Sequence, residues 1–433
     1  MVKPKQMNFT KSEELWSRAL KVVPCGTQCL SHGPTQYVTN VSPKYLVRGK
    51  GCIVWDADGN KFIDTAPGGY PHILGYAYKP VIKAVYEQMK KGNVFPMMHP
   101  LEVEVSELLA NTIPCAKMVR FGRNGADVTS MAVRASRAMT GRDKVLAGGY
   151  HGSHDWYIAT TERNKGIPEA VKKLTLKFEY NDLDGVKRLF EENKDQIAAV
   201  ILEPVQLSPP KDDYLKKLKD MAHNEGAVLI FDEIITGFRF AMGGAQEYFG
   251  VTPDMATFAK AMSNGFPISA LVGSEKCMEM FDQGVFFSTT YGGETTGLAA
   301  IKATVTELKE KNVIPFIWQQ GKKLKDGVLK IREKHNLQDV FDCIGYDCWH
   351  VMDFKGENKL INKSLFQQEC MKRGILAGLY HGVCYAHKDN HVEKILRVYD
   401  DAAKILRKKL DEGKVKESIE GLPIRPVFTS FKK

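Results

Sequence analysis

The sequence predicts an α/β protein, with a large domain built on a mainly parallel sheet and a smaller α+β domain formed from both chain ends. From about residue 75 to 320, short apolar runs alternate with amphipathic segments, which is typical of parallel strands covered by helices. Before this region a helix and two short strands are predicted, and after it come charged helices. At 433 residues the chain is also too long for one ordinary core.

The domain boundaries follow from these changes of pattern, because the chain shows no internal repeat and no Gly/Ser linker. We expect an N-terminal segment of the small domain over 1–70, the large domain over 71–320, and the C-terminal part of the small domain over 321–433.

Individual elements can be predicted from apolar spacing and turn residues. Residues 12–22 have helical spacing, and CIVWDADGNKFID from Cys52 predicts two strands joined by a turn at Asp58–Asn60. Five further apolar runs predict strands at 118–122, 144–148, 198–202, 227–231 and 255–259. Between the first two of these, a helix should place one set of apolar residues on a single face: Val128, Met131, Ala132, Ala135 and Met139.

Composition excludes several classes of protein. No segment approaches the run of about 20 apolar residues that a membrane span needs, and no secretory signal is visible, so we expect a cytoplasmic protein without membrane contact. Nine scattered cysteines favour free thiols, and Cys25 and Cys29 lack a second ligand pair, so no metal site is predicted. The net charge of +10 is spread along the chain, which favours a solvated surface over a nucleic-acid partner.

Ionisable residues follow three of the predicted strands. The runs end at Glu203, Asp232 and Lys260, and parallel sheets bind ligands at the carboxyl ends of their strands. A desolvated Lys260 would be a nucleophile for an aldehyde, although an ordinary surface lysine is the alternative. Asp232 needs a cationic partner if it is buried, and a protonated pyridine nitrogen is one, although a helix or turn cap would also explain it.

Two further segments suit an anionic, aromatic ligand. FGRNGADVTSMAVRAS reads as a strand, a turn at Asn124 and Gly125, and a helix whose first backbone N–H groups can bind a phosphate. Tyr150, at the end of the next strand, can stack on a heteroaromatic ring, or it can simply cover the edge of the sheet.

These residues carry a resemblance to a known family. The ordered set WDADGNKFID, NGAD, YHGSHD, LEPV, LIFDEIITGFR, GVTPDMATFAKAMSNGFP and STTYGGE resembles class III, fold-type I pyridoxal phosphate aminotransferases, particularly the branch around glutamate-1-semialdehyde 2,1-aminomutase. The resemblance covers the chain from about residue 12 onward. It implies a large domain with a seven-stranded, mainly parallel sheet between helices, pyridoxal 5′-phosphate as cofactor, and a homodimer with shared active sites.

The resemblance also implies roles for particular residues. Lys260 would hold the cofactor as a Schiff base and move the proton, and Asp232 would pair with the pyridine nitrogen. The rest of the implied cofactor site consists of Asn124, Gly125, Ala126, Tyr150, Glu203, Ile234 and, from the neighbouring subunit, Thr290. The implied substrate contacts are His32, Tyr70, His151 and Glu203.

Two departures from the aminomutase pattern bear on the reaction. The basic residue that binds the substrate carboxylate has no clear counterpart in CGTQCLSHGPTQ, and the loop after Glu203 reads QLSPPKDDYL. We therefore expect an aminotransferase that takes an amino group from an amino acid such as L-glutamate to an aldehyde or ketone, such as a sugar-derived or small phosphorylated metabolite. An intramolecular aminomutase is the alternative, and a basic binding module and an inactive cofactor-binding protein fit less well.

Overall fold

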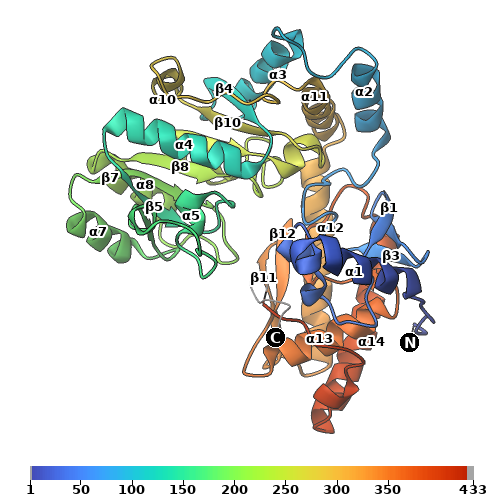
Figure 1. Ribbon diagram of the computed structural model, residues 1–433. Coiled ribbons are helices and arrows are strands. Elements are labelled where there is room, and N and C mark those ends of the chain that lie inside the picture. Colours follow the sequence, from blue (N-terminus) through green and yellow to red (C-terminus); the bar gives the residue numbers. More distant parts are fainter. Residues whose placement is uncertain (1, 427–433) are drawn as a thin grey trace. The chain divides into compact units, whose positions relative to one another are not determined.

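A computed structural model describes residues 2–426 of the chain. These residues form two compact units, one of residues 70–72 and 79–314 and the other of the remaining residues from both chain ends. Figure 1 shows the helices and strands of both units. Among the described residues, no helix combines the length and apolar character needed to cross a membrane.

The larger unit is built on a seven-stranded sheet in the order β4-β10-β9-β8-β7-β5-β6. Only β10 runs antiparallel to its neighbours, so the expected mainly parallel sheet is confirmed. Its strands are β4 (Met118–Gly122), β5 (Lys144–Gly148), β6 (Thr175–Lys177), β7 (Ile197–Leu202), β8 (Val228–Asp232), β9 (Met255–Phe258) and β10 (Ser269–Gly273). Every residue of β7 and β8 is buried, so both faces of the sheet centre are covered.

Helices surround this sheet. They are α2 (Lys79–Met89), α3 (Pro100–Ala110), α4 (Gly125–Thr140), α5 (Asp155–Ile158), α6 (Glu169–Lys172), α7 (Leu183–Glu192), α8 (Tyr214–Asn224), α9 (Ala245–Phe249), α10 (Glu275–Met278) and α11 (Thr295–Glu310). Figure 1 shows α4 lying along the sheet beside β8. The face of α4 predicted from apolar spacing, including Val128, Ala132 and Ala135, packs into one core with strand residues such as Ile201 and Ile230.

The smaller unit holds two sheets. A four-stranded sheet has the order β1-β2-β3-β13, with strands β1 (Leu46–Lys50), β2 (Ile53–Asp56), β3 (Lys61–Asp64) and β13 (Ile375–Leu376). A three-stranded sheet has the order β11-β12-β14, with strands β11 (Phe341–Tyr346), β12 (Trp349–Phe354) and β14 (Tyr380–His381). The principal helices are α1 (Thr10–Val22), α12 (Val313–Lys334), α13 (Lys359–Met371) and α14 (Asp389–Asp411).

The N-terminal hairpin of this unit forms at the turn predicted for it. Strands β2 and β3 pair antiparallel, and the Gly59 N–H donates to the Asp56 carbonyl. The Asp56 carboxylate also accepts the Asp58 and Asn60 N–H groups, and Gly59 has a φ of +88°, which favours glycine. The sequence DADGN therefore fixes the turn locally.

Candidate active site

The three ionisable residues predicted to follow strands lie at one edge of the large sheet. Strands β7, β8 and β9 are neighbours, and their register pairs Leu202 with Phe231 and Asp232 with Thr257. Glu203 therefore follows β7 beside the last residue of β8, and Lys260 follows β9 on the other side. The structure thus brings two carboxylates and one amine together at the carboxyl ends of parallel strands, where ligands of such sheets bind.

Asp232 is the most tightly held of the three. It is 3% exposed, and its Oδ2 lies 2.8 Å from Nδ1 of His151. Its Oδ1 accepts the Thr257 hydroxyl and the Ile234 N–H, both at 3.2 Å. The hydrogen bond from the Ile234 N–H is the turn cap that was the alternative role for Asp232. Asp232 therefore caps this turn and also lies at the edge of the sheet where the site residues meet. Hydrogen bonds to both oxygens hold the carboxylate in one orientation.

In this structure the side chain of His151 contacts the carboxylate of Asp232. Its ring is 1% exposed, lies 5.2 Å from the ring of Tyr157, and is stacked on Trp156 at 6.1 Å. These aromatic neighbours fix the imidazole plane, so His151 positions Asp232. The predicted contact of His151 with substrate stays a prediction.

Glu203 is a carboxyl that can change protonation near neutral pH. Burial, together with the negative charge of Asp232, raises the pKa of Glu203 to about 7, although the nearby charges of His151 and Lys260 oppose the increase. Its Oε2 accepts the Tyr150 N–H at 3.1 Å. A Cβ at Gly149 would lie 2.5 Å from this oxygen, so glycine is required for the close approach.

Lys260 stands in a backbone conformation that side chains rarely adopt. It begins a 3-10 turn, Lys260–Ser263, with a φ of +46°. A non-glycine residue in the left-handed region costs energy and persists only where the surrounding fold imposes it. The left-handed backbone at the partly buried Lys260, together with its electrostatic effect on Glu203, is consistent with a lysine placed for a function.

The start of α4 has the backbone arrangement expected of an anion site. Asn124 precedes the helix, Gly125 is its first residue, and the Asp127 carboxylate accepts the backbone N–H groups of Arg123 and Asn124. The next N–H groups, of Gly125 and Ala126, belong to the helix turn that has no intrahelical acceptors. A Cβ at Gly125 would lie 2.4 Å from Cδ1 of Ile234, so the helix start and the Ile234 side chain are adjacent.

The remaining predicted residues are more dispersed. Tyr150 is 51% exposed and makes an edge contact with Tyr157, and Thr290 is exposed in the loop before α11. Tyr70 is partly buried, and its carbonyl accepts a hydrogen bond from Nη2 of Arg239 at 2.9 Å. His32 belongs to the smaller unit, so its role stays a prediction.

Two neighbours of the site escaped prediction from the sequence. Thr257 lies inside the buried strand β9, where a threonine is usually interpreted as a β-branched packing residue. Arg239 is 1% exposed with its guanidinium 5.8 Å from the Tyr70 ring, and its position at the end of LIFDEIITGFR was the available signal.

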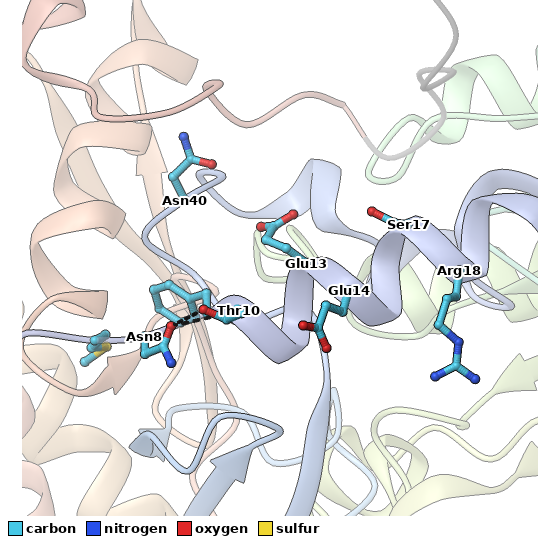
Figure 2. A pocket seen from close by; sticks show the side chains of 9 residues that line it. Asn8, Thr10, Glu13, Glu14, Ser17, Arg18 and Asn40 are labelled. Carbon is cyan, nitrogen blue, oxygen red and sulfur yellow. Dashed lines mark hydrogen bonds between the residues drawn. The ribbon is translucent and has the colours of Figure 1, made fainter.

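A groove of about 910 Å³ occurs elsewhere, in the smaller unit. It is lined by residues around α1, including Glu13, Glu14 and Arg18, with Asn40 across from the helix (Figure 2). None of the predicted site residues lines it. The candidate site is therefore defined by the chemistry at the sheet edge and the start of α4.

Comparison with known proteins agrees with this geometry. The family model described as aminotransferase class III matches residues 36–394. The chain is 33% identical to a 3-aminobutyryl-CoA aminotransferase of Cloacimonas acidaminovorans, over 89% of this chain and 94% of that protein. It is 35% identical to a glutamate-1-semialdehyde 2,1-aminomutase of Alkaliphilus oremlandii, over 92% and 100%. The crystal structure of an omega-transaminase from Sphaerobacter thermophilus has a TM-score of 0.84 at 27% identity, over 92% of this chain and 98% of that one.

The residues present fit pyridoxal 5′-phosphate. A glycine at the start of α4 lets backbone N–H groups meet a phosphate, Asp232 offers a held carboxylate for a pyridinium nitrogen, and Lys260 offers an amine. The close packing of Ile234 against Gly125 places an apolar side chain beside the helix start, where it can cover one face of a ring. The resemblance stated from the motifs is thus confirmed, and the chain belongs to the class III aminotransferase family, with pyridoxal 5′-phosphate as its cofactor.

Proposed function

We propose that this protein is an intermolecular aminotransferase. It takes an amino group from an amino acid, with L-glutamate as the first candidate, and gives it to an aldehyde or ketone. Sugar-derived or small phosphorylated carbonyl compounds are the acceptor class to test first. The observation that carries the proposal is the group of Glu203, Asp232 and Lys260 at adjacent strand ends, in a chain of the class III aminotransferase family.

When bound, pyridoxal phosphate supplies a carbonyl carbon that takes up an amine and a ring that accepts electrons. The carboxylate of Asp232 would stabilise a positive charge on the ring nitrogen, because it is buried and held in one orientation. The Nζ of Lys260 removes the proton from the substrate carbon that carries the amine and returns a proton later. The start of α4 holds the phosphate and so fixes the distance between Lys260 and the reacting carbon.

Glu203 is suited to a supporting proton-binding role. Because burial and the charge of Asp232 raise its pKa to about 7, the carboxyl can be either protonated or ionised near neutral pH. It can therefore donate to or accept from an oxygen of cofactor or substrate as the charge at that oxygen changes. Burial and the charge of Asp232 favour the protonated form, and the charges of His151 and Lys260 favour the ionised form.

The sequence around the site favours transfer between molecules over an internal shift, and both activities are named among the relatives. The loop QLSPPKDDYL after Glu203 and the stretch CGTQCLSHGPTQ lack the aminomutase pattern. A relative aligned over 94% of its own length is named an aminotransferase. The alternative is an aminomutase that returns the amine to the adjacent carbon of the same substrate, and several relatives at 35–38% identity carry that name.

We further propose that two copies of the chain build each site. Thr290 is exposed in its own subunit, in a loop that also exposes Phe286 and Tyr291. Such a surface is suited to contact with a second copy of the chain. The Thr290 hydroxyl would then complete the phosphate site at the start of α4 in that second copy.

The first test fixes the cofactor. Borohydride reduction of the purified holoprotein followed by peptide mass spectrometry should find the cofactor on Lys260. Lys260→Ala should lose this adduct, and the exposed Lys276→Ala should keep it. A protein that carries no cofactor, or carries it on another lysine, would contradict the proposal.

The second test separates the two reactions. L-Glutamate or L-alanine added without an acceptor should release a stoichiometric amount of the matching oxo acid and convert the cofactor to its amino form. Turnover should then require a carbonyl acceptor. Turnover of glutamate 1-semialdehyde without any second substrate, and with no oxo acid released, would instead establish the aminomutase.

A further inference from the structure

A buried group of metal-ligand side chains lies in the smaller unit. Cys343, His350 and His381, here called the Cys343 cluster, each offer a ligand atom, and these atoms lie within 4.8 Å of one another. Cys343 is 5% exposed, and both histidines are 0% exposed. No residue predicted to bind the cofactor or the substrate belongs to this cluster.

Strand register brings the three together. His350 of β12 lies directly opposite His381 of β14 and, on its other side, opposite Gly345 of β11. Cys343 precedes Gly345 by two residues, so it points to the same face of the sheet as its diagonal neighbour His350. Gly345 has a φ of +104°, which favours glycine. A Cβ at this position would lie only 3.0 Å from Cα of His350, so the absence of a side chain lets the two strands approach closely beside the cluster.

Three of the four ring nitrogens of His350 and His381 are buried without a well-formed hydrogen bond. Neither nitrogen of His350 makes a hydrogen bond of normal geometry with the described residues, although the backbone of Tyr346 and Asp347 lies nearby, and Nδ1 of His381 also makes none. The two rings have centroids 4.6 Å apart, and simple packing would leave Nδ1 of His381 without a partner and the nitrogens of His350 with no more than poorly aligned backbone contacts. Buried polar atoms usually have a partner, and a ligated ion is one kind.

The other nitrogen of His381 is held in the way that metal ligands usually are. Its Nε2 lies 2.9 Å from the hydroxyl of Tyr399, which is itself fully buried. This contact fixes the ring and leaves Nδ1 as the nitrogen for a metal, since ligating histidines usually donate their second N–H to a fixed oxygen. Both histidines are fully buried, and the neutral imidazole is the form that binds a metal.

Nearby charges do not oppose a cation strongly, because they are paired. Lys325 lies 3.8 Å from Asp347 and donates to the Gly345 carbonyl, and Arg332 pairs with Asp342.

We propose that the Cys343 cluster binds a thiophilic d10 cation, Zn²⁺ or Cu⁺, through one thiolate and two imidazoles. One sulfur and two nitrogens suit such ions and exclude Mg²⁺ and Ca²⁺, which prefer oxygen ligands.

Binding requires two small changes at the cluster. The thiol proton of Cys343 leaves to solvent as the sulfur–metal bond forms, because the thiolate is the form that binds a metal. Bound sulfur and nitrogen atoms lie about 3.3–3.8 Å apart in a tetrahedral site, so the ligand atoms must move together slightly from the separations found here. The ion ties β14, a strand of only two residues, to β12 and β11.

The test uses the purified holoprotein, stripped with a chelator and offered Zn²⁺, or Cu⁺ under anaerobic conditions with a reductant. We expect one of these ions to remain at a stoichiometric level through gel filtration against a competing chelator, and its identity decides between zinc and copper. The retained ion should also raise the thermal unfolding midpoint. Retention of neither ion would overturn the proposal.

Variants locate the ion. Cys343→Ser should weaken binding by at least about 100-fold, because a ligand is lost, and Tyr399→Phe by about 10- to 100-fold, because the support of His381 is lost. Cys348→Ala, a buried cysteine in the same hairpin, and Cys25→Ser/Cys29→Ser, the exposed pair, should leave affinity unchanged. An ion that persists in Cys343→Ser at wild-type affinity would refute the site.

A spectroscopic measurement on the wild type guards against variants that fail to fold. X-ray absorption of the loaded protein should show one sulfur and two imidazole nitrogens around the metal. A shell of oxygen atoms, or of two sulfurs, would place the ion elsewhere and overturn the proposal. A loss of aminotransferase activity alone decides nothing here, so the cluster and the proposed function can fail independently.

Discussion

The residues around Asp232 show how a buried charge is made useful. Removing an ionised carboxylate from water costs much free energy, and hydrogen bonds compensate for only part of that cost. Asp232 has three such contacts, from His151, Thr257 and the Ile234 backbone. Together they hold the carboxylate in place before any ligand arrives, so the site does not have to reorganise during the reaction.

The value of this carboxylate can be measured by substitution. Asp232→Asn keeps the shape but removes the charge, and we expect kcat to fall by about 10²- to 10³-fold. Thr257→Val removes one neutral hydrogen bond to the same carboxylate and should cost about tenfold or less. Steady-state kinetics on holoenzymes with equal cofactor content measure both. Equal losses in the two variants would show that the charge of Asp232 has no special part in catalysis.

Glu203 makes stability depend on pH in a defined direction. Its pKa is raised from 4.5 to about 7 in the folded chain, so between these values the folded state binds more protons than the unfolded state. The free energy of unfolding of the apoprotein should therefore fall as pH rises from about 4.5 to 7, by at most about 3 kcal/mol from this group. The contribution is fully present below the unfolded value and is lost above the folded one.

Glu203→Gln tests this assignment. The variant should lose part of the fall in stability that the wild type shows between pH 5 and pH 7, as measured by denaturant unfolding. It will not lose all of it, because burial also raises the pKa of Glu233 to about 7. A variant whose pH dependence matches the wild type would show that Glu203 is not the titrating group.

At the scale of elements, the start of α4 depends on one missing side chain. A Cβ at Gly125 would lie 2.4 Å from Cδ1 of Ile234, far closer than two carbons can approach. Gly125→Ala must therefore displace Ile234 or the helix start. Such overpacking costs about 1–3 kcal/mol, which corresponds to about a 5- to 150-fold loss of cofactor affinity if the strain falls on the phosphate site.

The double variant Gly125→Ala/Ile234→Val is the control for this steric explanation. Valine lacks Cδ1, so the closest contact is removed and affinity should largely return, as measured by fluorescence titration of the apoprotein with pyridoxal phosphate. Ile234→Val alone should have a small effect. If the double variant binds no better than Gly125→Ala, backbone freedom at residue 125, and not the contact with Ile234, is what matters.

Elements differed in how far the sequence could predict them, for physical reasons. Strands β4, β5 and β7 are short, mainly apolar runs followed by acid, glycine or turn residues, so the local pattern located them within a residue. Strand β13 has two residues and pairs parallel with β3, more than 300 positions away, and β14 is equally short. Such pairing is decided by the packed fold and leaves no period in the sequence.

The same reason explains which site residues could be found. Asp232 and Lys260 end strands whose order and direction can be inferred, so their meeting at one edge could be predicted. The contact of His151 with Asp232 depends on how the loop after β5 turns back, which no spacing encodes. The Cys343 cluster depends on the register of three strands, so its ligands have no motif spacing, and no metal site was predicted.

At the scale of the whole molecule, the single chain leaves apolar side chains in water around Thr290. Phe286 is 70% exposed and Tyr291 52% exposed, and Met97 and Met98, before α3 in the same unit, are 72% and 80% exposed. Exposed apolar groups of this size favour burial against another chain. The proposed dimer would give them that burial and would bring Thr290 to a site in the other subunit.

Mixed dimers test this assembly and the place of Thr290 together. Lys260→Ala removes the amine, and Thr290→Glu puts a negative charge beside the phosphate, so each homodimer should be nearly inactive. In a heterodimer of the two, one site combines the intact Lys260 of one subunit with the intact Thr290 of the other. Coexpression, or mixing under conditions that allow subunit exchange, should therefore restore activity to about a quarter of wild type, since about half of the dimers are mixed and each holds one intact site; heterodimers purified through two affinity tags should reach about half. If Thr290 served its own subunit, every site in the mixture would carry a defect and no activity would return, so purified heterodimers with intact cofactor binding but no activity would refute the shared site.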